Sequence, residues 1–249
     1  MLKGRGLKKR FGSVEALRGV DISVRPGKIT LLVGPSGSGK TTLLKCLAFL
    51  ERPDSGIISF NGNSFTYPDA EAPKESPWPE LTVVFQQHFL WPHLTIRENI
   101  LLPIRYQRHT QSNGFEELVA LFEMEDFIDR HPNQVSLGQR QRAALARALV
   151  INPKMILMDE ITSALDVEQI GKIAKHLLEL RSRGIGILLI THLLDFARGL
   201  LYRGEGDVIV FLDKGEVLEA GGHEVLVSPK HPRVVEFISQ MEFTHRIKK

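Results

Sequence analysis

Residues Gly34–Thr41 read Gly-Pro-Ser-Gly-Ser-Gly-Lys-Thr and match the pattern G-x-x-x-x-G-K-[ST]. The apolar run Ile29–Val33 before them predicts a strand, and the leucine spacing of Lys40–Leu50 after them predicts a helix. Backbone N–H groups of such a turn, with the positive helix end, surround phosphate groups. A chance match in a chain of this length is on the order of 1%. The feature therefore predicts an α/β fold that carries a phosphate-binding loop.

The roles of the loop residues follow from this geometry. We expect Lys40 to reach the β- and γ-phosphates of a nucleotide and to act in catalysis by offsetting their negative charge. We expect Thr41 to ligate Mg²⁺. The alternative, a Gly/Ser turn with a surface lysine, does not explain the strand and helix on either side. The residues predicted to contact the nucleotide here are Gly34, Pro35, Ser36, Gly37, Ser38, Gly39, Lys40, Thr41 and Thr42.

Composition narrows the class of protein. The chain has 249 residues, of which 43% are hydrophobic and 24% charged, as in an ordinary soluble globular protein of one or two lobes. No apolar run approaches the ~20 residues of a membrane-spanning helix. A single cysteine, Cys46, excludes an internal disulfide framework. The net charge of +3 is too small to argue for nucleic acid binding. We interpret the basic N-terminus (residues 3–10) and Arg246–Lys249 as solvated ends.

Hydrophobic patterning predicts one domain over residues 1–249 with an inserted helical lobe. The core is expected at about 1–86 and 151–227, the lobe at about 87–150 and a C-terminal helix at about 228–243. Continuous apolar strands alternating with helices predict a mostly parallel sheet, with an antiparallel β region at the N-terminus. Predicted strands are Val20–Val24, Ile57–Phe60, Leu81–Phe85, Met155–Met158, Ile185–Thr191 and Val208–Leu212, and predicted helices are Arg140–Val150, Val167–Arg181 and Pro232–Met241. Residues 67–79 are expected to form a surface loop.

Two carboxylates follow one of the apolar strands. Asp159 and Glu160 come directly after Met155–Met158, so they are placed at the carboxyl edge of the sheet, where α/β folds bind ligands. Asp159 is predicted to hold Mg²⁺ and Glu160 to act as the general base on the attacking water. Alone, the pair would be interpreted as acidic residues that end a strand. Together with the phosphate loop, the catalytic interpretation is favoured.

The phosphate loop, the carboxylate pair and several further short motifs occur in one order along the chain. In this order the chain resembles the ATP-binding subunits of ABC (ATP-binding cassette) transporters. The core of that family is a RecA-like P-loop NTPase. The resemblance assigns Phe11 to stacking on adenine, Gln86 to sensing Mg²⁺ and the γ-phosphate, and His192 to the γ-phosphate. It places Asp166, in Ser163-Ala164-Leu165-Asp166, at a dimer interface. Each has a plainer alternative: a core aromatic, a polar strand end, a structural histidine and a helix N-cap.

Residues Val135–Gln139, here called the signature segment, read Val-Ser-Leu-Gly-Gln. Alone they would be the capped start of a helix. The hydroxyl of Ser136, the small Gly138 and the helix end from Gln139 form an anion-binding device. The resemblance implies that two chains pair head to tail around two ATP molecules, so that this segment closes on the nucleotide held by the other chain.

Four places depart from the family pattern. Leu137 stands where glycine is usual, and Ile161 replaces a proline after the catalytic acid. The stretch Leu200–Gly206 resembles a small insertion, and Gly221-Gly222 is atypical. None of these changes removes a phosphate, metal or base group.

Partners are implied by the resemblance as well. The aromatic stretch His88–Thr95 lies where the family receives a helix of the membrane permease, with Trp91 the stronger contact candidate. Residues Pro229–Arg233 and Glu236–Ile238 resemble the tail of the polar amino acid uptake group. That group works on the cytoplasmic face of the inner membrane with a solute-binding protein. A soluble ABC-type ATPase acting on ribosomes or DNA is the alternative. A P-loop kinase would not explain the signature segment or His192.

Overall fold

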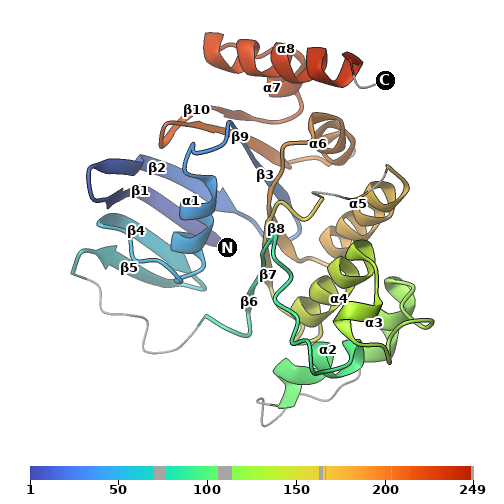
Figure 1. Cartoon of the computed structure of the whole chain (residues 1–249). Helices are drawn as coiled ribbons and strands as arrows, with labels where there is room; N and C mark the ends of the chain where they lie inside the picture. Colours follow the sequence, from blue (N-terminus) through green and yellow to red (C-terminus); the bar gives the residue numbers. More distant parts are fainter. Residues whose placement is uncertain (70–76, 106–113, 163–164, 166, 203, 248–249) are drawn as a thin grey trace.

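The structure is a computed structural model of the chain and describes residues 1–69, 77–105, 114–162, 165, 167–202 and 204–247, the last six as backbone only (Figure 1). Two sheets organise it. A four-stranded antiparallel sheet has the order β2-β1-β4-β5. Its strands are β1 (Leu2–Phe11), β2 (Val14–Val24), β4 (Ser55–Phe60) and β5 (Asn63–Tyr67). The expected antiparallel β region at the N-terminus is present.

The first strand corrects our interpretation of the basic N-terminus as a solvated end. Residues 2–11 pair with both β2 and β4, and the side chains of Leu2 and Leu7 are fully buried. Lys9 Nζ lies 2.6 Å from Glu51 Oε1 and donates to the carbonyl of Arg52 at 2.7 Å. Leu2 and Leu7, rather than the charged residues between them, determine the structure of this segment, because their side chains pack on the core on either side of a shift in strand register.

The second sheet has six strands in the order β10-β9-β3-β8-β7-β6. Strands β6 to β9 and β3 are parallel, and only β10 runs antiparallel to its neighbour β9. Every residue of β3, β7 and β8 is buried, as expected for strands covered on both faces. The strands are β3 (Ile29–Val33), β6 (Leu81–Val84), β7 (Met155–Asp159), β8 (Gly186–Ile190), β9 (Val208–Asp213) and β10 (Glu216–Gly221).

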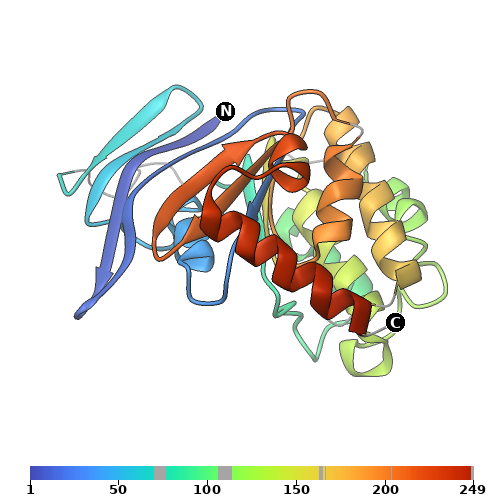
Figure 2. The ribbon, with the colours of Figure 1, turned by 90° about the horizontal axis from the view of Figure 1, so that it is seen from above.

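Helices cover this sheet on two sides (Figures 1 and 2). Helix α1 lies between the two sheets, where Leu43, Leu44 and Leu47 join an apolar core with residues of both. The remaining helices α2 to α6 pack on the other face around a larger core. The helices are α1 (Lys40–Leu47), α2 (Ile96–Arg105), α3 (Phe115–Leu121), α4 (Leu137–Leu149), α5 (Val167–Ser182), α6 (Leu194–Leu201), α7 (Glu224–Val227) and α8 (Pro232–Ile247), with a 3-10 turn η1 (Pro132–Gln134).

Several boundaries differ from the sequence predictions. Helix α1 ends at Leu47 rather than Leu50, and Phe49 adopts a left-handed backbone with φ 58°. Helix α4 begins at Leu137 rather than Arg140, because Ser136 caps it. Residues 87–95 contain no helix, whereas the predicted helical lobe begins at about residue 87. Strands β5 and β10 and helix α6 were not predicted, because each is short and its apolar residues are few or contiguous.

Candidate active site

The phosphate loop joins β3 to α1 and folds over its own lysine. Lys40 Nζ donates hydrogen bonds to the carbonyls of Gly34 at 2.9 Å and Pro35 at 2.8 Å. Burial lowers the pKa of Lys40, while the nearby carboxylates oppose the shift. Gly39 has φ 105°, and a Cβ there would meet the Ala16 carbonyl oxygen at 2.3 Å, so glycine is required. The loop thus holds a cationic group at the N-terminus of a helix, which suits a phosphate.

The predicted metal ligands lie beside this loop. Thr41 Oγ1 donates to Asp159 Oδ2 at 2.9 Å, which links the start of α1 to the end of β7. Burial raises the pKa of Asp159, and the bond from Thr41 only partly offsets it. In the described parts of the chain, no group of three or more His, Cys, Asp or Glu side chains is arranged to hold a metal ion by itself. A hydroxyl and one carboxylate nevertheless fit Mg²⁺, since at nucleotide sites this ion takes few protein oxygens and completes its shell with phosphate and water.

Glu160 and His192 meet across neighbouring strands. The backbone N–H of Glu160 donates to the carbonyl of Ile190 at 3.1 Å, and His192 Nε2 is hydrogen-bonded to Glu160 Oε1. Glu160 has a left-handed backbone with φ 51°, a conformation that non-glycine residues adopt rarely and at some cost. The strained turn presents this carboxylate to the histidine while Asp159, one residue earlier, faces Thr41.

The remaining nucleotide contacts predicted from the sequence are placed as follows. Gln86 is exposed just beyond the end of β6. Phe11 ends β1 with its ring 47% exposed, and Lys9 Nζ lies 5.0 Å from the ring centroid. The β1–β2 hairpin is tied to the phosphate loop, because Ala16 of β2 closes over Gly39. Asp166, with Ser163 and Ala164 of the same motif, lies outside the described residues.

The signature segment begins helix α4 on the helical side of the molecule. Ser136 Oγ accepts from the N–H of Gln139 at 3.2 Å, and Gln139 Oε1 accepts from the N–H of Ser136 at 2.8 Å. This reciprocal capping box fixes the helix start. A Cβ at Gly138 would lie 2.4 Å from Oε1 of Gln169 on α5. A side chain at this position would therefore have to displace the amide of Gln169, a neighbour that the sequence pattern alone did not reveal.

The stretch His88–Thr95 is held by two side chains that sequence reasoning missed. Arg147 donates to the carbonyls of His88 and Phe89, each at 2.7 Å. The fully buried Asn99 accepts from the N–H of Trp91 at 2.7 Å and donates to its carbonyl at 3.1 Å. Trp91 itself remains 52% exposed. A buried asparagine and a basic residue on the two helices that follow are the signals that could have identified this anchored loop.

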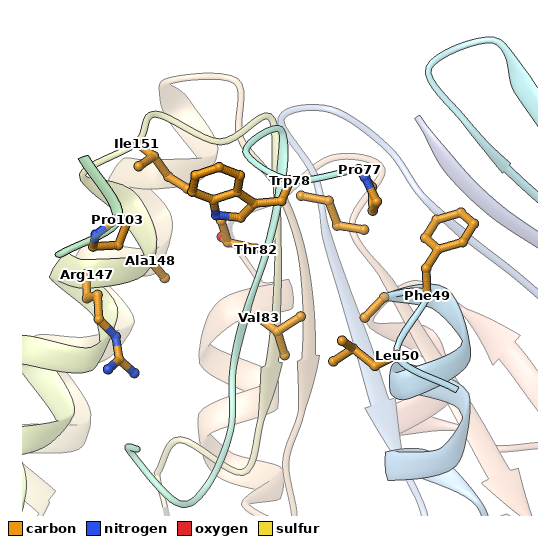
Figure 3. A pocket seen from close by; sticks show the side chains of 12 residues that line it. Phe49, Leu50, Pro77, Trp78, Thr82, Val83, Pro103, Arg147, Ala148 and Ile151 are labelled. Carbon is orange, nitrogen blue, oxygen red and sulfur yellow. The ribbon is translucent and has the colours of Figure 1, made fainter. Parts of the chain in front are cut away.

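Next to this anchored loop the surface is hollowed. A cavity of about 670 Å³ opens between the end of α1 and helices α2 and α4, above strand β6. Figure 3 shows Leu50 on one side, Arg147 on the other and Trp78 at the rim. Leu50 is 60% exposed and Trp78 39%. The cavity thus presents apolar side chains from both the sheet region and the helical region.

Comparisons with known proteins agree with this geometry. The family model described as "ABC transporter" matches residues 17–163, more than half of the chain. The L-cystine import ATP-binding protein TcyN of Bacillus subtilis is 35% identical over 97% of this chain and 93% of its own length. The glutamine transport ATP-binding protein GlnQ of Escherichia coli is 34% identical, over 97% of this chain and all of its own length. The dimeric ABC transporter cassette MJ0796 has a TM-score of 0.78 at 32% identity, covering 90% of this chain and 99% of that one.

The fold, the phosphate loop and these similarities define the class of protein. The chain belongs to the ABC transporter family. It is an ATP-binding cassette subunit with ATPase activity, and the α/β fold with its helical region agrees with the solved cassettes. No helix within the described residues is long and apolar enough to cross a membrane.

Proposed function

We propose that this chain hydrolyses ATP to power the uptake of an amino acid through a membrane permease. One observation carries the catalytic part: Thr41 with Asp159, and Glu160 with His192, form two pairs at the carboxyl ends of β7 and β8, beside the phosphate loop. The amino acid part rests on relatives such as TcyN and GlnQ, whose names specify cystine import and glutamine transport.

The chemistry assigned to these residues is in-line attack of water on the γ-phosphate. Glu160 accepts the proton of the attacking water, and His192 holds the carboxylate in place through their hydrogen bond. Lys40 offsets negative charge on the phosphoryl group as the bond to the leaving ADP breaks. Thr41, Asp159 and Gln86 would hold Mg²⁺, which supplies further charge neutralisation when bound.

A second chain completes the site in this proposal. Ser136, Gly138 and Gln139 lie at the start of α4 and present a helix N-terminus outward, as an anion-binding element requires. Phe11 would stack on adenine, and Asp166 would cross the interface. The solved cassette MJ0796 is dimeric, which supports a head-to-tail pair here.

The closing experiment uses Glu160→Gln. This variant should hydrolyse ATP about 10²–10⁴-fold more slowly, since it has lost its general base. It should still bind ATP and should run as a dimer with ATP but as a monomer without it, measured by size-exclusion chromatography with light scattering. Lys40→Ala serves as the matched control that loses nucleotide binding and stays monomeric. Normal turnover by Glu160→Gln would remove this residue from its role.

The permease is proposed to dock at the cavity beside the anchored loop. Its short helix would lie between Leu50 and Arg147, and Trp91 would contact it from the adjacent loop. We infer that the subunit then works on the cytoplasmic face of the membrane, in a system that also includes a solute-binding protein. Charge and fold argue for no nucleic acid partner.

Docking is tested by Leu50→Glu and Trp91→Ala in a membrane-reconstituted complex. Both variants should lose solute-stimulated transport by at least about ten-fold while their solution ATPase rate stays within two-fold, because neither residue touches nucleotide. Val227→Ala, another exposed apolar residue, should retain transport. If the chain instead co-purifies with ribosomes or DNA and not with membranes, the soluble ATPase alternative takes the place of this proposal.

A further inference from the structure

A second hollow lies on the helical face away from the phosphate loop and the permease cavity. Helices α5 and α6 run side by side there (Figure 2), and a groove of about 570 Å³ lies along them. Its base is made of small and aliphatic residues, and its edges carry an aromatic residue and three basic residues. The residues that line it are Gly171, Ala174, Lys175, Leu178, Arg198, Gly199, Tyr202 and His223.

The two stretches that depart from the family pattern meet in this groove. Tyr202 belongs to Leu200–Gly206, and His223 follows Gly221-Gly222 directly. Their rings form an edge-to-face pair with centroids 5.8 Å apart. The Tyr202 backbone is fixed, since its N–H donates to the carbonyl of Arg198 at 2.9 Å and closes helix α6. The ATPase chemistry uses neither residue, so the groove is a feature of this chain that catalysis does not explain.

The shape of the groove suits an inserted side chain. A Cβ at Gly171 or Gly199 would meet no atom within 4 Å, so both glycines leave open space between the helices. Tyr202 is 78% exposed although it is fixed at its backbone. An exposed tyrosine beside an apolar hollow is typical of the residues that dominate protein–protein binding energy.

The charge of the groove selects its partner. None of its eight lining residues is acidic, whereas Lys175, Arg198 and His223 are basic. Lys175 makes none of the ion pairs found between described residues, and Arg198 pairs with exposed Asp195 at 3.3 Å. Exposed pairs of this kind contribute little to stability, so the pair leaves the positive charge of Arg198 available to attract a partner carboxylate. The nearby acid Glu224 accepts from the N–H of Gly222 at 2.7 Å.

We propose that this groove binds an acidic segment of a partner protein. The segment would insert an apolar side chain between Gly171 and Gly199, pack on Tyr202, and place carboxylates against Lys175 and Arg198. The chain's own C-terminal residues, which include Arg246, Lys248 and Lys249, are basic and would be repelled. This surface is independent of ATP hydrolysis and of the permease cavity.

The test measures peptide binding to the full-length chain by two-dimensional NMR. The probe is a short synthetic peptide of alternating glutamate and leucine around one tryptophan, compared with its lysine counterpart. The glutamate peptide should bind at least about ten-fold more tightly at low salt, with shifts confined to α5, α6 and residue 223, and more weakly at high salt. Equal binding of both peptides, or shifts elsewhere, would overturn the proposal.

Three variants assign the binding to the groove. Gly199→Leu fills the open space without a clash and should abolish binding, while its helix stays folded by circular dichroism. Tyr202→Ala should weaken binding about ten-fold or more, and Lys175→Glu should remove the preference for the glutamate peptide. Arg5→Glu, an equal charge change on an exposed residue of β1, should leave binding unchanged.

Other occupants give distinct results that would refute an acidic protein segment. Tyr202-dependent sedimentation with phosphatidylglycerol vesicles would assign the groove to a lipid surface. Tyr202-dependent self-association in analytical ultracentrifugation would assign it to a second copy of the chain. In either case the ATPase rate of Tyr202→Ala should remain normal, so failure here leaves the proposed function untouched.

Discussion

The phosphate loop and the signature segment both offer a helix N-terminus to an anion, yet their surroundings differ. Around the phosphate loop, Lys40 is 6% exposed, bonded to its own loop, and closed by Ala16 of a neighbouring strand. At the signature segment, Ser136 is exposed, and its capping partner Gln139 belongs to the same four-residue turn. The phosphate loop is thus enclosed by several elements of one chain, whereas the signature segment is a helix start capped within its own turn.

This difference fits the proposal that one copy of the chain makes only part of an active site. The phosphate loop can surround a phosphate by itself, whereas the exposed Ser136 needs an anion to be brought to it. The amide end of Gln169 on α5 lies close to Gly138, within 2.4 Å of where a Cβ at that position would be. In the proposed dimer, this helix start would be used by the other chain.

The largest effect is expected when two inactive variants are mixed, and this experiment tests whether the phosphate loop and the signature segment act together from different chains. Lys40→Ala disables the phosphate loop. Ser136→Asp disables the signature segment, since aspartate keeps the helix cap but repels phosphate. Each variant alone should lose at least about 10²-fold in hydrolysis. An equal mixture should recover hydrolysis well above that of either variant alone, because a mixed dimer keeps one intact site, made of Lys40 of one chain and Ser136 of the other.

The control for this experiment separates charge from capping. Ser136→Asn also preserves the cap but adds no charge, so it should retain far more activity than Ser136→Asp. Steady-state phosphate release measures all of these variants. Absence of any recovery in the mixture, with dimers shown by light scattering, would mean that both halves of a site come from one chain.

Much of the site around the phosphate loop could be predicted from the sequence, because its residues lie next to strands that the sequence shows. The phosphate loop lies between a strand and a helix adjacent in sequence, and Asp159-Glu160 directly follows an apolar strand. Both were therefore expected at the same edge of the sheet. The fold class followed from the same alternation of strands and helices. The structure confirms that these residues lie close together, whereas all their roles in catalysis, in holding Mg²⁺ and in nucleotide binding stay predictions, those of Phe11, Gln86 and Asp166 included.

The remainder depended on contacts between distant residues, which periodicity does not encode. The Gln169 amide against Gly138, Asn99 within the aromatic loop, and the meeting of Tyr202 with His223 each join separate elements. Strand β1 was missed for a different reason, since it carries many lysines and arginines and its buried leucines do not alternate regularly. Leu2 and Leu7 are five residues apart and still face the core, because the strand register shifts between Gly4 and Leu7.

A smaller effect is expected from Asp159→Asn, which tests whether the buried charge beside the phosphate loop lowers the stability of the fold. Burial raises the pKa of Asp159 above its ordinary value of 3.8, so the folded chain binds this proton more readily than the unfolded chain. The charged carboxylate thus costs stability above the raised pKa, and the cost disappears below about pH 4. With EDTA present and no nucleotide, the variant should melt a few degrees higher at pH 7.5 than the wild type.

The stability gain should come with a loss of function. Magnesium-dependent ATPase activity of Asp159→Asn should fall at least about ten-fold, because a neutral amide is a poorer Mg²⁺ ligand. Thr41→Val gives the comparison, since it removes the hydroxyl that donates to this carboxylate and should lower the melting temperature instead. A lower melting temperature for Asp159→Asn at pH 7.5 would contradict the electrostatic argument.

The smallest expected effect comes from a change in the signature segment alone. Gln139→Ala removes one arm of the capping box but leaves the Ser136 hydroxyl bonded to the backbone of residue 139. One exposed cap interaction is worth about 0.5–1 kcal/mol, so the melting temperature should fall by about 2–4 °C or less.

ATP affinity of the isolated Gln139→Ala chain should not change, because the nucleotide is expected on the phosphate loop. The KM for hydrolysis should rise as the chain concentration is lowered, since a frayed signature helix weakens dimer closure. A change in monomer affinity, measured by titration calorimetry, would instead place the signature segment within reach of its own chain's nucleotide.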